Sequence, residues 1–136
     1  MIHRAIRVRD WTVDFLFVDG RNDPEGIIAW LYSFGATRSI ADDTRELMES
    51  GMNRGFTFSN TERRIALSWI GPQANGTEWV NTTVHEIVHV AQAIASADGT
   101  EPLSEEFAYL VGDITQAVAD ILCHLACDRC REKPEG

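Results

Sequence analysis

Four segments in the first half of the chain show the alternation of apolar and polar residues, or the short apolar runs, that are typical of β-strands. We expect strands at 5–9, 11–18, 56–59 and 65–70. The second is the clearest, because apolar residues occupy every odd position from Trp11 to Phe17. This period of two predicts a strand with one buried face.

Apolar residues at helical spacing, together with capping residues, predict four helices. The expected bounds are about 24–34, 40–48, 77–97 and 105–131. Asp23 followed by Pro24 is a typical helix start. Gly99 is a typical end for the third helix, and Ser104 can cap the fourth. The strands and helices thus alternate in pairs, which predicts an α+β fold with a small antiparallel or mixed sheet.

The length and charge of the chain limit the number of domains and the kinds of partner to expect. Its 136 residues suit one domain, and no linker or repeat divides them, so we predict a single domain over 1–136. A formal net charge of −9 argues against nucleic acid and anionic membranes as partners. There is no apolar run long enough for a membrane span and no signal-peptide pattern at the start. We therefore expect a cytoplasmic protein. No feature predicts its oligomeric state.

Three cysteines lie close together near the end of the chain, at Cys123, Cys127 and Cys130. An odd, clustered set is not typical of a disulfide framework, so we expect reduced thiols. With His124 they allow a second, structural metal site as an alternative, although only one Cys-x-x-Cys pair is present. Small buried apolar side chains are the simpler interpretation.

The chemistry of the chain is concentrated in the sequence His-Glu-Ile-Val-His at 85–89, inside a predicted helix. His85 and His89 are four residues apart, so both imidazoles leave the same side of the helix about one turn from each other. This spacing lets them bind one metal ion, and two such nitrogens suit zinc. Glu86 projects about 100° away from His85, from where its carboxylate can reach a water on the metal without being a ligand.

The apolar residues of this helix are expected to form a separate stripe, which comprises Val84, Ile87, Val88, Ala91, Ile94 and Ala95. His85 and His89 lie on a flank outside it. A histidine that only fills the core would normally lie within such a stripe. The pattern therefore favours a metal site over two unrelated surface histidines.

A catalytic zinc usually has three protein ligands and an open position for water. Glu105 and Glu106 are candidates for the third ligand, because they open the helix that follows the turn at Gly99. Glu105 shares a face with small residues such as Gly112, and we expect this small face to pack against the metal-binding helix. Glu105 is therefore the preferred ligand and Glu106 the reserve. The alternative is that both only stabilise the helix N-terminus.

These segments resemble the gluzincin metallopeptidases. The likeness comprises 83–89, Thr-Val-His-Glu-Ile-Val-His, and 105–112, Glu-Glu-Phe-Ala-Tyr-Leu-Val-Gly. More specifically, they are similar to the minimal versions found in phages and in prophage-like elements of gut bacteria. The resemblance implies a zincin-like α+β fold, in which a small sheet packs on an active-site helix and a following long helix.

The resemblance also assigns roles to individual residues. It implies that His85, His89 and Glu105 bind Zn²⁺ and that Glu86 is the general base. Tyr109 matches a tyrosine of the family, and its hydroxyl is implied to donate a hydrogen bond to the oxyanion. In this chain Tyr109 stands where thermolysin-like members have an aspartate that steadies a ligand histidine.

The function implied is a zinc-dependent metallopeptidase that hydrolyses a peptide or protein substrate. In zincins an edge strand pairs with the substrate backbone, and the strand at 65–70 is expected to take that place. One alternative is a zincin scaffold that binds metal without turnover and serves in phage assembly or regulation. Another is a zinc amidase acting on peptidoglycan cross-links. Glu86 favours an enzyme, because an inactive scaffold needs no general base.

Overall fold

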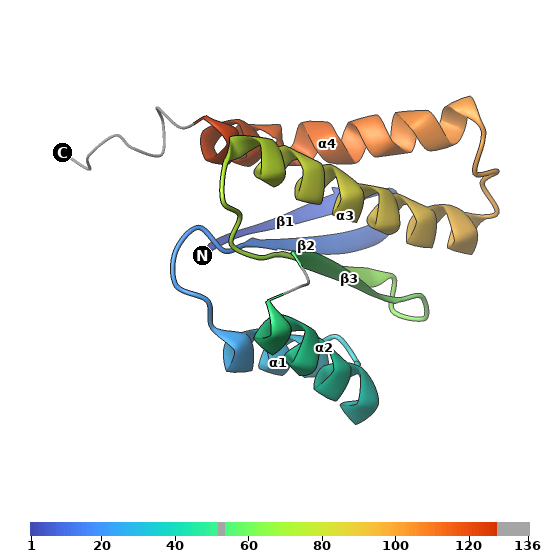
Figure 1. Ribbon diagram of the computed structural model, residues 1–136. Coiled ribbons are helices and arrows are strands. Elements are labelled where there is room, and N and C mark those ends of the chain that lie inside the picture. Colours follow the sequence, from blue (N-terminus) through green and yellow to red (C-terminus); the bar gives the residue numbers. More distant parts are fainter. Residues whose placement is uncertain (52–53, 128–136) are drawn as a thin grey trace. The chain divides into compact units, whose positions relative to one another are not determined.

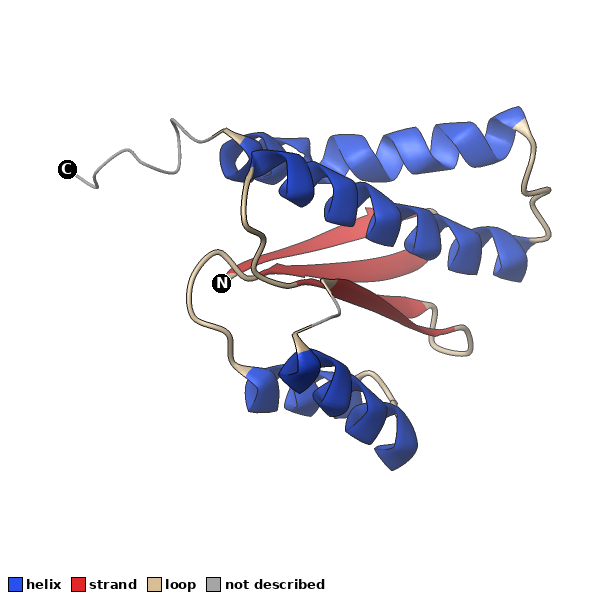
Figure 2. Ribbon diagram, in the orientation of Figure 1, coloured by secondary structure: helices blue, strands red, loops and turns tan. Residues whose placement is uncertain are grey.

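A computed structural model describes residues 1–51 and 54–127 of the chain (Figure 1). The chain forms two compact units, Met1–Pro72 and a second that begins at Gln73. The first contains β1 (Ile2–Val8), β2 (Trp11–Phe17), α1 (Pro24–Ser33), α2 (Arg38–Ser50), β3 (Gly55–Asn60) and β4 (Ile65–Ile70), and the second contains α3 (Gly76–Asp98) and α4 (Glu105–Ala126). The order of elements is the predicted one, which confirms the α+β class (Figure 2).

The four strands form one mixed sheet in the order β1-β2-β4-β3. Two antiparallel hairpins, β1–β2 and β3–β4, are joined by parallel pairing of β2 with β4. The prediction that the strand at 65–70 is an edge strand is wrong, because β4 has a neighbour on each side. The backbone groups of a central strand are already paired, so β4 cannot also pair with a substrate. The edge strands are β1 and β3.

β2 is buried at every position except Thr12, rather than on one face as its period of two predicts. Such continuous burial is typical of a central strand. Its charged residue, Asp14, is buried and contacts the ring nitrogen Nε2 of His3 on β1. β1 begins at Ile2, earlier than predicted, and this extension brings His3 beside Asp14. His3 is thus engaged within the β1–β2 hairpin.

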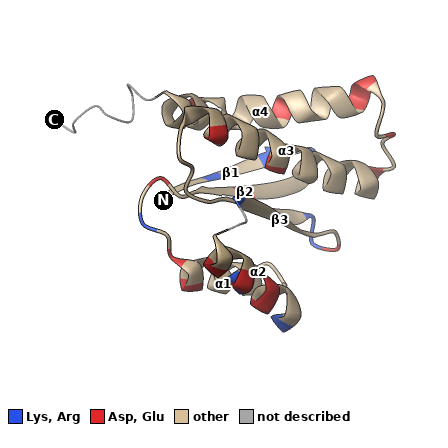
Figure 3. Ribbon diagram, in the orientation of Figure 1, with Lys and Arg blue, Asp and Glu red and all other residues tan. Residues whose placement is uncertain are grey.

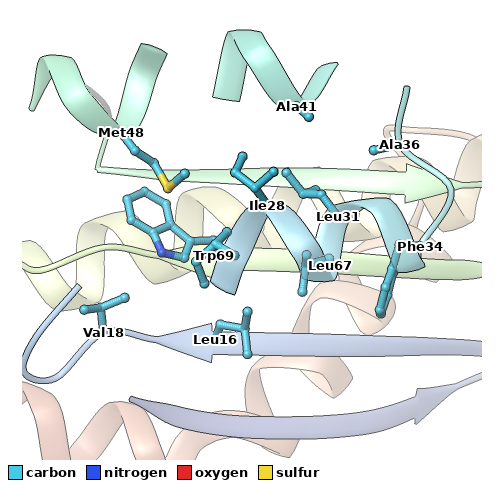
Figure 4. Close-up of a cluster of buried hydrophobic side chains, with 11 residues drawn as sticks. Leu16, Val18, Ile28, Leu31, Phe34, Ala36, Ala41, Met48, Leu67 and Trp69 are labelled. Atoms are coloured by element: carbon cyan, nitrogen blue, oxygen red, sulfur yellow. The ribbon is translucent and has the colours of Figure 1, made fainter. Parts of the chain in front are cut away.

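Helices α1 and α2 pack on one face of this sheet through a cluster of buried apolar side chains (Figure 4). The sheet contributes Leu16, Leu67 and Trp69, Val18 follows directly after β2, and the helices contribute Ile27, Ile28, Leu31, Ala41 and Met48. Full burial of one large apolar side chain stabilises a fold by about 1.5–3 kcal/mol. The cluster therefore holds both helices against the sheet. Asp23 caps α1 as predicted, because its side chain accepts from the backbone N–H of Gly26.

The outer sides of α1 and α2 are rich in acidic residues (Figure 3). Arg45 of α2 lies among them, and its guanidinium donates to Glu25 at 3.0 Å and to Asp42 at 3.2 Å. The hydrogen bond to Glu25 and the charge of that carboxylate raise the pKa of Arg45 above its ordinary value. The ion pair between Arg45 and Glu25 links α1 to α2.

The second unit is a hairpin of two long antiparallel helices (Figure 1). Gly99 ends α3 with a positive φ of 73°, and the side chain of Ser104 accepts from the N–H of Phe107 to cap α4, both as predicted. The opposite end of the hairpin is tight, because a Cβ on Gly76 would overlap the carbonyl oxygen of Ala126. Glycine therefore permits a close approach of the two helices at that point.

α4 ends at Ala126, and Cys127 is its C-terminal cap. The rest of the predicted extension of this helix, including Cys130, lies outside the described residues. Among the residues that are described, no helix has both the length and the apolar composition required to cross a membrane.

Candidate metal centre

The His-Glu-Ile-Val-His sequence lies in the middle of α3, a helix whose start is fixed by local hydrogen bonds. Asn75 Oδ1 accepts from the N–H of Glu78 at 2.9 Å, and the Glu78 carboxylate accepts from the N–H of Ala74 at 3.0 Å. This reciprocal arrangement acts in the manner of a capping box. Two turns of helix then lead to the histidines, which therefore project from a regular element rather than a loop.

His85, Glu86 and His89 form a group that can hold a metal ion. One ligand atom from each residue lies within 4.8 Å of the other two. The Nε2 atoms of His85 and His89 are 3.1 Å apart, and their ring centroids are 4.7 Å apart. The helical spacing thus brings the two imidazoles together as predicted.

The distance between the two nitrogens fits a tetrahedral zinc ion. Two Zn–N bonds of about 2.0–2.1 Å that meet at the tetrahedral angle place their nitrogens about 3.3 Å apart. The observed 3.1 Å is close to this value. Imidazole and carboxylate donors also suit other divalent metals of the first transition row. The geometry therefore supports a metal site without selecting one metal.

Glu86 differs from its two neighbours in exposure. Its side chain is 2% exposed, whereas His85 and His89 are exposed. The other buried residues near it on α3 are Trp79, Thr82, Thr83, Ile87 and Val90. The predicted apolar stripe is therefore wrong in part, because Val84 is 40% exposed and Val88 is half-buried, while Glu86 lies on the buried face. A carboxylate in such surroundings interacts more strongly with a nearby cation than it would in water.

His89 has a second partner, which the His-Glu-x-x-His pattern does not predict. The Nδ1 atom of His89 lies 3.2 Å from Oε1 of Gln92. An amide oxygen only accepts, so the Nδ1–H of His89 donates to it. The signal in the sequence was the spacing, because residues three apart on a helix lie on the same side.

Contrary to the prediction, the small face of α4 does not pack against α3. Ala108, Tyr109 and Gly112 are exposed, and a Cβ built on Gly112 would meet nothing within 4 Å. The buried residues are instead on the more apolar side and comprise Leu110, Ile114, Val118, Ile121, Leu122 and Leu125. Burial of large apolar surface decides which side of a helix packs, and small residues alone do not.

The two acidic candidates, Glu105 and Glu106, lie in the first turn of α4 and are exposed. Glu106 Oε1 accepts from the hydroxyl of Thr100 at 3.5 Å. In the described ranges, the metal-binding group contains no carboxylate besides that of Glu86. The structure therefore does not bring Glu105 or Glu106 together with the histidines, and Tyr109 is 69% exposed on the same helix.

The register of the hairpin accounts for this separation. Gly76 lies opposite Ala126 at one end of the hairpin. The same number of residues counted from this contact along each antiparallel helix places Glu105 opposite Ala97. Ala97 lies about 12 Å along the helix axis from His89. A ligand on α4 that joined the histidines would have to come from the middle of that helix.

The cysteines show no sign of a second metal site within the residues described. Cys123 is exposed, Cys127 is half-buried, and neither forms a disulfide with a described residue. They belong to no group of metal-binding side chains in that part of the chain. Cys130 lies outside the described residues, so the prediction that all three are reduced stays a prediction.

Comparison of the chain with protein-family models, with curated proteins and with solved structures finds no match.

Proposed function

We propose that this protein is a zinc-dependent metallopeptidase that hydrolyses peptide bonds in a peptide or protein substrate. The observation that carries the proposal is the group of two exposed imidazoles and one buried carboxylate on α3. Its ligand atoms lie within 4.8 Å of one another. In the order His-Glu-x-x-His the carboxylate comes directly after the first histidine, which suits a general base next to a metal-bound water.

The residues of α3 divide the chemistry between them. His85 and His89 hold the ion through their Nε2 atoms. A zinc ion held there would supply a water of lowered pKa, near 7 in known enzymes, and would polarise the scissile carbonyl. Glu86 takes the proton of that water and delivers it to the leaving amine. Because Glu86 is 2% exposed, bulk water does not compete for its carboxylate.

The roles of Glu105 and Tyr109 rest on the resemblance to gluzincins. In that scheme Glu105 is the third ligand and Tyr109 donates a hydrogen bond to the oxyanion. Both side chains lie on the exposed face of α4. The zinc site proposed here therefore depends on His85 and His89. Glu105 is an additional ligand only in a conformation in which the exposed face of α4 points toward α3.

A second candidate function is a metal-binding scaffold without turnover, which serves in phage assembly or regulation. It is favoured by one specific observation: in the described part of the chain, the metal-binding group holds two histidines and Glu86, with no third ligand from α4. Such a site would retain metal without the full set of groups of a hydrolase.

The test compares three proteins: wild type, Glu86→Gln, and Glu101→Gln as a matched control in the exposed loop before α4. Each is loaded with zinc, analysed for bound metal and incubated with a peptide library. We expect all three to bind zinc and Glu86→Gln to lose turnover by about 10²–10⁴-fold, because only the proton transfer is removed. Cleavage by Glu86→Gln at the wild-type rate would contradict the mechanism. Bound zinc with no cleavage by wild type would favour the scaffold.

A further inference from the structure

We propose that Gln92 is a positioning residue of the metal site, which fixes the tautomer and the orientation of His89 so that Nε2 is ready to bind the metal. The inference rests on the proposed role of His85 and His89 as ligands. It concerns a contact between two side chains of α3 and needs no group from another element.

The contact defines which nitrogen of His89 carries the proton. Gln92 Oε1 lies 3.2 Å from His89 Nδ1 and can only accept a hydrogen bond. A neutral imidazole has a single N–H, so that proton is placed on Nδ1. The lone pair on Nε2 is then free to bind a cation.

The same hydrogen bond orients the ring. An imidazole that projects from an exposed helical position can rotate about two side-chain bonds. The bond from Nδ1 to a side chain one turn further along α3 restricts that rotation. It also raises the electron density of the ring, which strengthens Nε2 as a donor to a metal.

His85 differs from His89 in this respect. The two Nε2 atoms are 3.1 Å apart, and with its proton on Nδ1 the Nε2 atom of His89 can only accept in that contact. Without a metal the contact is a hydrogen bond only if the Nε2–H of His85 donates. Metal binding then requires the proton of His85 to move from Nε2 to Nδ1 through solvent, whereas His89 already has the binding tautomer. The two ligands are therefore unequal, and Gln92 is the cause.

The tautomers can be observed directly. Imidazole ¹⁵N chemical shifts of the full chain would be recorded at a pH where both rings are neutral, with and without added Zn²⁺. We expect His89 to show the Nδ1–H form in both samples and His85 to change from the Nε2–H form to the Nδ1–H form when zinc is added. A predominantly Nε2–H form of His89 in the zinc-free protein would overturn the proposal.

The contribution to metal affinity is tested with variants of Gln92. Gln92→Met removes the acceptor but keeps the side-chain length and a high helix propensity, whereas Gln92→Glu keeps an acceptor. Gln116→Met makes the same substitution at an exposed position of α4. Competition with a chromophoric chelator gives the Zn²⁺ affinity of each protein.

We expect Gln92→Met to bind Zn²⁺ at least about tenfold more weakly than wild type, and Gln92→Glu and Gln116→Met to remain within about threefold. Equal affinities of Gln92→Met and wild type would overturn the inference while leaving the proposed function intact. A wild type that binds no zinc would instead refute the proposed function. The tautomer of His89 in the zinc-free protein would still decide whether Gln92 positions the ring.

Discussion

α3 and α4 are adjacent helices of similar length, and the sequence of each carries candidate ligands, but only α3 brings its candidates together. In α3 the site consists of residues one to four positions apart, so the helix itself fixes their geometry. In α4 the candidates are placed by the packing of one helix on another. A site defined within a single helix can therefore be recognised from spacing, whereas a ligand from a second helix depends on which face packs and on the register of the pair.

The sharpest way to test which face of α4 packs is to remove buried and exposed side chains in parallel. Ile114→Ala should lower the free energy of unfolding by about 2–5 kcal/mol, because Ile114 is fully buried and its loss leaves a cavity. Tyr109→Ala should change it by less than about 0.5 kcal/mol, because Tyr109 is 69% exposed. Urea denaturation of the full chain measures both. A larger loss for Tyr109→Ala than for Ile114→Ala would mean that the small face is the packed one.

The register of the hairpin is tested by two glycines. Gly76→Ala should destabilise the protein by about 1–3 kcal/mol, because the new methyl group meets the carbonyl oxygen of Ala126. Gly112→Ala should stabilise it by about 0.5–1 kcal/mol, because alanine favours the helix and the space around it is open. Thermal unfolding of the two variants compares them directly. A Gly76→Ala variant that is as stable as wild type, or more stable, would refute the close approach of the helices at Gly76.

The smallest effect is expected at the start of α4. Glu105→Gln and Glu106→Gln should each change the Zn²⁺ affinity by less than about threefold, because an exposed carboxylate more than 10 Å along the axis from His89 does not reach the ion. Chelator competition measures these affinities. A loss of about tenfold or more for Glu105→Gln alone would show that Glu105 is a ligand and that α4 presents its small face to α3.

Local signals predicted much of this structure. The caps at Asp23 and Ser104, the helix end at Gly99 and the pairing of His85 with His89 all depend on residues within one turn of each other, and all four are confirmed. Such features are decided by backbone hydrogen bonds and side-chain reach, which spacing determines.

Nonlocal features were harder to predict. The sequence of β4 does not reveal that β2 pairs beside it in parallel, so its central position could not be read from its apolar residues. For α4, the small residues suggested a close helix contact, but the larger apolar side decides the packing. The contact between Gln92 and His89 had a local signal, because the two residues are three positions apart on a helix. A glutamine three positions after a histidine is too common, however, for this spacing alone to predict a contact.

Zinc titration is the most direct test of the proposal that His85 and His89 together bind one metal ion. The full-length wild type, the double variant His85→Ala/His89→Ala and the control His124→Ala, which removes an exposed histidine of α4, would be titrated with Zn²⁺ against a chromophoric chelator. We expect about one tightly bound zinc per chain for wild type and for His124→Ala, and none for the double variant. Unchanged zinc binding by the double variant, or no binding by wild type, would contradict the account.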